Sequence, residues 1–129
     1  MSPNNYMEII QLTEDAVGFH SMNAIAILFA YVTAMYIAGK NLSKFQLILI
    51  SVLYTFFYIA PSFTTAGNLD RVARMQLDFF TNFPTEASAF LGPGFSPEGF
   101  YFNPLLIAFF LAWLASIFFM LDIRRRAKK

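Results

Sequence analysis

The chain contains no cysteine and few charged residues. Of its 129 residues 13% are charged, against about 25% in an ordinary soluble domain. The absence of cysteine excludes disulfides, thiol catalysis, iron–sulfur clusters and cysteine-ligated zinc. A hydrophobic share of 57% indicates that lipid, rather than water, surrounds most of the chain.

Charge is missing altogether from three long stretches. Residues 16–39, 45–69 and 99–121 contain no Asp, Glu, Lys or Arg, and each is long enough to cross a hydrocarbon core of about 30 Å at about 1.5 Å per helical residue. We therefore predict an all-α membrane protein with one integral membrane domain over residues 1–129. Its three transmembrane helices are expected at about 21–39, 45–63 and 104–121.

The first span is expected to be retained rather than cleaved. The first 20 residues hold three acids and no Lys or Arg. A cleavable signal peptide has a basic segment ahead of its apolar core.

The basic residues gather on one side of the predicted spans. Seven of the nine lie there: Lys40, Lys44, Arg124, Arg125, Arg126, Lys128 and Lys129. That side carries one acid, Asp122, whereas the other side carries Arg71 and Arg74 with seven acids. An excess of Lys and Arg near span ends marks the cytoplasmic side. We expect a multi-pass protein of a cell membrane, the bacterial inner membrane being favoured, with its N-terminus outside and its C-terminus in the cytoplasm.

Helical periodicity continues outside the spans. Residues 5–17 are expected to form a short amphipathic helix at the outer surface, and residues 69–83 an amphipathic outer helix after span two. Pro61 is expected to kink or end the helix near residue 58. Asp70 to Arg74 and Arg74 to Asp78 are each four residues apart, a spacing that favours ion pairs.

The outer loop, about 64–103, ends in a segment rich in aromatic residues. These are Phe90, Phe95, Phe100, Tyr101 and Phe102. Disordered polar linkers are poor in aromatics, so we expect this segment to be ordered on the outer ends of the spans or on lipid headgroups.

Small residues recur every four positions in two spans. They are Ala26, Ala30, Ala34 and Ala38 in span one and Ala108, Ala112 and Ser116 in span three. Such a groove lets two helices approach closely. The two spans are expected to be parallel, so the grooves could mate within one subunit or between copies; alternatively, the alanines only reflect how common alanine is in membrane helices.

A hydroxyl-bearing stripe follows one face of span two. We group its members with two residues of span one as a polar seam: Thr33, Tyr36, Ser51, Thr55, Tyr58 and Ser62. Hydroxyls in lipid need partners, and Ser and Thr can also bond back to their own helix. The seam is interpreted as structural, with a site for a small ligand or lipid as the alternative.

The middle of each span holds no Asp, Glu, Lys, Arg or His. This counts against proton relays, ion-coupled transport and voltage sensing, which need such groups. His20 is the only imidazole, at a span end. We predict no catalytic residue, no cofactor site and no metal site, and a net charge of +1 gives no argument for nucleic-acid binding.

Three functional hypotheses follow. The first is a non-enzymatic membrane protein that works by helix–helix association, as a homo-oligomer or an accessory subunit of a larger membrane complex. The second is pore formation, which is implied by a resemblance to the layout of a class I phage holin. The likeness consists of three spans, the expected topology, small size and a basic C-terminal tail. The third is lipid or small-ligand binding at the polar seam. Expected partners are membrane lipid and either a second copy or another membrane protein.

Overall fold

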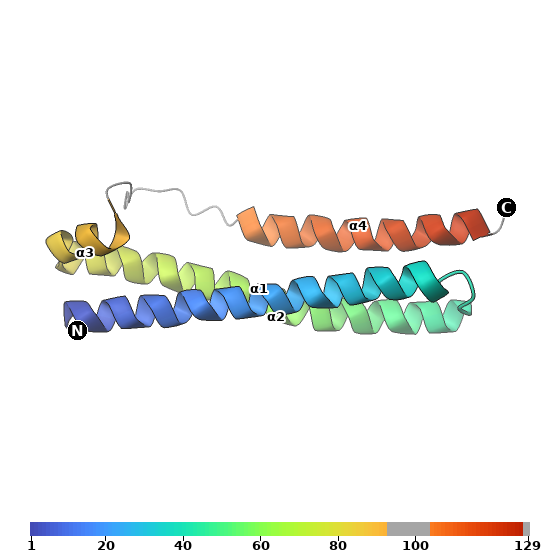
Figure 1. Cartoon of the computed structure of the whole chain (residues 1–129), viewed down its shortest axis with the longest axis horizontal. Helices are drawn as coiled ribbons and strands as arrows, with labels where there is room; N and C mark the ends of the chain where they lie inside the picture. Colours follow the sequence, from blue (N-terminus) through green and yellow to red (C-terminus); the bar gives the residue numbers. More distant parts are fainter. Residues whose placement is uncertain (93–103, 128–129) are drawn as a thin grey trace.

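The computed structural model describes residues 1–92 and 104–127, which form four α-helices (Figure 1). They are α1 (Pro3–Ala38), α2 (Lys44–Asn82), α3 (Pro84–Leu91) and α4 (Pro104–Ala127). No strand occurs in these two ranges, which confirms the all-α class for the described part of the chain. Three of the helices, α1, α2 and α4, are long and apolar enough to cross a membrane, so the protein is membrane-embedded.

Helices α1 and α2 form a long antiparallel hairpin. A short turn after α1 leads to Ser43, which caps α2: its side chain accepts from the Gln46 N–H at 3.2 Å, while the Gln46 side chain accepts from the Ser43 N–H at 2.9 Å. This capping box satisfies two backbone donors that the helix itself leaves open. We call this end of the hairpin the turn end, and the opposite end, where α3 lies, the α3 end (Figure 1).

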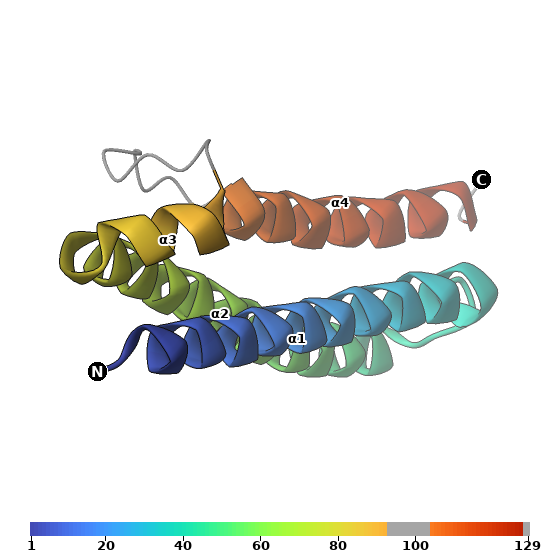
Figure 2. The ribbon, with the colours of Figure 1, turned by 60° about the vertical axis from the view of Figure 1, so that its left-hand side comes forward.

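Helix α4 lies beside the half of the hairpin that contains the turn. Figure 2 shows it running along α1 and α2 there, while α3 covers the other end of α2. Buried residues of α1, α2 and α4 form one cluster: Ala24, Tyr31, Met35, Tyr54, Tyr58, Phe109 and Met120. The membrane-spanning parts are thus held together by contacts among all three helices.

The hairpin is longer than a bilayer is thick. At about 1.5 Å per residue, α4 with its 24 residues is close to the hydrocarbon thickness of about 30 Å. Helices α1 and α2, with 36 and 39 residues, exceed it. Because α4 lies beside their turn halves, the parts of α1 and α2 that extend beyond α4 are their α3 ends, which we call the projecting parts (Figures 1 and 2).

The two amphipathic segments predicted at residues 5–17 and 69–83 are the projecting parts of α1 and α2 rather than separate helices. Their apolar faces meet each other and α3 in a second buried cluster: Tyr6, Ile10, Val72, Phe79 and Ala87. Residues 64–82 of the predicted outer loop belong to α2, and Phe90 belongs to α3. The other aromatic residues of that loop, Phe95, Phe100, Tyr101 and Phe102, lie outside the described residues.

Pro61 does not end α2. The helix continues through the proline to Asn82, so of the two predicted effects, a kink or a helix end near residue 58, the second is wrong. The hydroxyls of Ser62 and Thr65 donate to the carbonyls of Tyr58 and Pro61 at 2.7 and 2.8 Å, which adds hydrogen bonds within the helix next to the proline. Helix α1 also packs against α2 on both sides of the proline.

Tyr6 joins the projecting ends of α1 and α2. Its hydroxyl donates to the Asp78 carboxylate, and its ring stacks on Phe79 with centroids 5.2 Å apart and planes 7° apart. The hydrogen bond to Asp78, followed by burial, raises the pKa of Tyr6 above its usual value. Asp70 forms the predicted pair with Arg74 at 2.9 Å, whereas Asp78 is engaged by Tyr6 instead.

Tyr6→Phe should loosen the projecting end. The substitution removes the hydroxyl that binds Asp78 and keeps the ring that stacks on Phe79. We expect trypsin to cleave after Arg71 and Arg74 several-fold faster under native conditions, because cleavage requires local opening. The control is Tyr36→Phe, at a position on α1 that is 72% exposed. Equal cleavage rates in the two variants would contradict the role of this hydrogen bond.

Candidate functional site

Three tyrosines lie at the centre of the membrane-spanning bundle. Tyr31 of α1 stacks on Tyr54 of α2 with ring centroids 3.9 Å apart and planes 9° apart. Tyr54 also contacts Tyr58 at 5.5 Å, and Tyr58 meets the edge of Phe109 of α4 at 6.2 Å. These rings are buried, so aromatic contacts run continuously from α1 through α2 to α4.

Each of these tyrosines also makes a hydrogen bond to another helix. The Tyr31 hydroxyl lies 3.0 Å from the Ser51 hydroxyl, and the Tyr54 hydroxyl lies 2.8 Å from that of Ser116. The Tyr58 hydroxyl donates to the Phe109 carbonyl at 2.9 Å. An unpaired hydroxyl in hydrocarbon is costly. These bonds therefore favour the packed arrangement over separated helices.

Further hydrogen bonds connect the polar side chains beside the tyrosines. Ser116 donates to the Trp113 carbonyl at 2.6 Å, which leaves its oxygen to accept from Tyr54. Trp113 Nε1 donates to the Thr55 hydroxyl at 3.1 Å, and Thr55 in turn donates to the Ser51 carbonyl at 2.8 Å. Among the described residues, no buried side-chain polar atom is left without a hydrogen-bond partner.

The seam borders an apolar groove between α2 and α4. The groove has a volume of about 530 Å³ and is lined by Thr55, Tyr58, Ile59, Ser62, Phe63, Leu106, Ile107, Phe109, Phe110 and Trp113. No acid, cation or imidazole is among these residues. The described part of the chain also contains no group of three His, Asp or Glu residues that could hold a metal ion. The chemistry available in this groove is apolar contact.

The structure brings together four of the six residues predicted for the polar seam. Ser51, Thr55, Tyr58 and Ser62 lie on the inward side of α2, partly or fully buried. The other two, Thr33 and Tyr36, lie exposed on α1 and take no part in these contacts.

The two small-residue stripes do not face each other within the chain. Ala26, Ala30 and Ala34 are exposed on α1, and Ala38 is half-buried. On α4, Ala108 is exposed, Ala112 half-buried and Ser116 buried. The face that α1 turns inward instead carries Ala24, Tyr31 and Met35.

The sequence pattern missed Tyr54 and Trp113. Tyr54 lies three residues after Ser51 and four before Tyr58, so its spacing placed it on the same face. Trp113 and Phe109 of α4 carry no comparable signal, because their partners lie 58 and 51 residues away in sequence.

The basic residues that predicted the membrane orientation gather at the turn end, as far as the structure describes them. Lys40 and Lys44 flank the α1–α2 turn, and Arg124, Arg125 and Arg126 lie in the last turn of α4. Arg124 joins the two groups, since its guanidinium donates to the Leu42 carbonyl at 3.1 Å. Lys128 and Lys129 lie outside the described residues.

The chain matches no known family model, no curated protein sequence and no solved structure.

Tyr54→Phe should weaken the attachment of α4. The substitution keeps the stacked ring and removes the hydrogen bond to Ser116. We expect a loss of about 0.6 to 2 kcal/mol in the free energy of unfolding in bicelles, the range for interhelical hydrogen bonds in membranes. Tyr36→Phe is again the matched control, and an equal free energy in the two variants would show that the Tyr54 hydroxyl contributes nothing.

Proposed function

We propose that this protein works by helix–helix association in the membrane, as a homo-oligomer or as an accessory subunit of a larger membrane complex. The observation that carries this proposal is the alanine face of α1, formed by Ala26, Ala30 and Ala34. These residues are exposed, while another face of the same helix packs against α2 and α4; Ala26 also borders a hollow between α1 and α2.

The alanine face suits a second helix better than it suits lipid. Small side chains let two helix backbones come close enough for extensive van der Waals contact, which is a main attraction between helices in a bilayer. Thr33 lies exposed between Ala30 and Ala34 and brings a hydroxyl to the same side, where it could bond across the contact. Large exposed side chains lie near the alanine face, among them Phe29 and Ile37 at 64% and 67% exposure.

Ala30→Leu combined with Ala34→Leu should weaken association. Leucine side chains would hold the partner backbone away from α1. We expect energy transfer between labelled copies in vesicles to require at least about fivefold more protein per lipid, equivalent to about 1 kcal/mol. If unaltered copies show no energy transfer, the homo-oligomer form is wrong, and retention of co-purifying membrane proteins in mild detergent tests the accessory form with the same variants.

The control variant introduces the same two leucine side chains on α4 instead of α1. Ala108 and Ala115 are exposed on α4, and Ala108→Leu with Ala115→Leu should leave association unchanged. Equal effects of the two double variants, or no effect of either, would overturn the role of the alanine face.

We also propose that the turn end faces the cytoplasm of a cell membrane and the α3 end faces outward. The support is the charge distribution: five described cations gather at the turn end, with Asp122 as the one acid beside them, whereas the acids of α1, α2 and α3 lie toward the other end. Short segments rich in Lys and Arg remain on the cytoplasmic side.

Single cysteines can test this orientation, because the chain contains none. Glu86→Cys in α3 should react with a membrane-impermeant maleimide in intact cells. Asn41→Cys in the α1–α2 turn should react only after the cells are permeabilised. Both residues are exposed, so burial would not mask either one. The reverse labelling pattern would show that the topology is inverted.

A further inference from the structure

A groove made of three neighbouring hollows follows one flank of α2 and α4. It consists of three successive hollows of about 650, 610 and 530 Å³. The first two share Leu47, Ile48 and Leu121, and the second and third share Thr55 and Ile59. The three hollows therefore adjoin one another from the turn end of the bundle to the part of α2 that carries Thr55 and Ile59.

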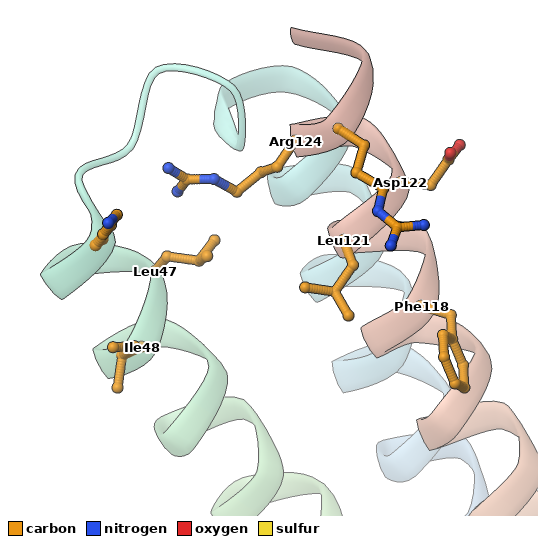
Figure 3. Close-up of a pocket in the computed structure, with 8 residues that line it drawn as sticks. Leu47, Ile48, Phe118, Leu121, Asp122 and Arg124 are labelled. Carbon is orange, nitrogen blue, oxygen red and sulfur yellow. The ribbon is translucent and has the colours of Figure 1, made fainter. Parts of the chain in front are cut away.

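Three cations line the groove at the turn end. This basic rim consists of Lys44 from α2 and Arg124 and Arg125 from α4, and the hollow beneath it is about 650 Å³. Arg124 is half-buried and donates to the Leu42 carbonyl at 3.1 Å, which holds its guanidinium across the space between α4 and the turn (Figure 3).

One acid lies beside the basic rim without neutralising it. Asp122 also lines the hollow, but its carboxylate accepts from Arg126 at 2.9 Å. Figure 3 shows Asp122 pointing away from Arg124. The rim therefore keeps an excess of positive charge.

The walls below the rim are apolar and face the surrounding lipid. Ile48 and Val52 are 63% and 60% exposed, and Leu121 is 47% exposed on the facing helix. From Leu47 to Ile59 the first two hollows follow α2 for about 18 Å at about 1.5 Å per residue. That length is slightly more than half of a hydrocarbon core of about 30 Å, which is the depth that the acyl chains of one leaflet occupy.

We propose that this groove binds one anionic phospholipid from the leaflet at the turn end. Its phosphate lies at the basic rim, and one acyl chain follows the groove along α2 and α4. A free phosphate would leave the apolar walls uncovered, and a zwitterionic headgroup would bring its own cation to a rim that is already positive. This site uses the α2–α4 flank, so it is independent of the association face proposed on α1.

Trp113 allows the proposal to be tested directly. It is the only tryptophan of the chain and lines the far part of the groove, about 16 Å along α4 from Arg124. Bromine atoms in the middle of an acyl chain quench tryptophan fluorescence on contact. We would reconstitute the full chain in phosphatidylcholine vesicles and titrate in brominated phosphatidylglycerol or brominated phosphatidylcholine with the same chains.

We expect the brominated anionic lipid to reach half-maximal quenching at a mole fraction at least about threefold lower than the zwitterionic one, because each cation near the headgroup favours negative charge. Equal quenching by the two lipids would overturn the proposal.

Two double variants, one at the basic rim and one at the α3 end, test whether the rim cations bind the lipid. Lys44→Gln with Arg125→Gln removes two rim cations and leaves the Arg124 bond to Leu42 in place. The ratio of the mole fractions at which the zwitterionic and the anionic lipid reach half-maximal quenching should then fall close to one. Arg71→Gln with Arg74→Gln removes the same charge at the α3 end and should keep the preference. Retained preference in the rim variant would overturn the proposal.

Salt dependence tests the unaltered protein, in case the rim variant does not fold. Raising NaCl from about 0.05 M to about 0.5 M shortens the range of electrostatic attraction to a few ångströms. The preference for the anionic lipid should decrease, while quenching by the zwitterionic lipid stays constant. A preference that salt leaves unchanged would contradict a phosphate held by the basic rim.

Discussion

Polar groups in hydrocarbon must find partners inside the protein, and in this bundle the partners of the buried tyrosines lie on other helices. Tyr31 reaches Ser51, Tyr54 reaches Ser116, and Tyr58 reaches the Phe109 carbonyl. Lipid tails are as apolar as the helix surfaces, so water does not drive these helices together. Hydrogen bonds and close ring contacts therefore determine how α4 sits on the hairpin, and the outward faces follow from that arrangement.

With the tyrosines turned inward, two contrasting surfaces remain toward the membrane. The alanine face of α1 consists of small exposed side chains, which suits the close approach of another helix. The flank of α2 and α4 is hollowed, apolar and bordered by the basic rim, which suits an elongated molecule with a negative head. The two surfaces lie on different helices, so protein association and lipid binding would not compete for the same side chains.

The two halves of the hairpin are held together differently. The half beside α4 is joined by the hydrogen bonds of Tyr31, Tyr54 and Tyr58, whereas the projecting parts are joined by buried apolar surface. There Tyr6, Ile10, Val72 and Phe79 form a cluster that α3 covers. The same two helices serve both regions, and this requires α2 to remain helical through Pro61. Packing against α1 along its whole length supplies that continuity.

The sequence by itself determined the membrane class, the three spans and the grouping of cations at one end, because charge is costly in lipid and its absence from a long stretch is visible in local composition. It also identified one face of α2, since helical spacing places Ser51 and Tyr58 together. Only the tertiary structure decided how each helix is rotated about its axis. That rotation buries Tyr31 and leaves Thr33 and Tyr36 exposed, and it pairs Tyr54 with Ser116, 62 residues away. Such choices depend on contacts between distant segments, which no local pattern of residues encodes.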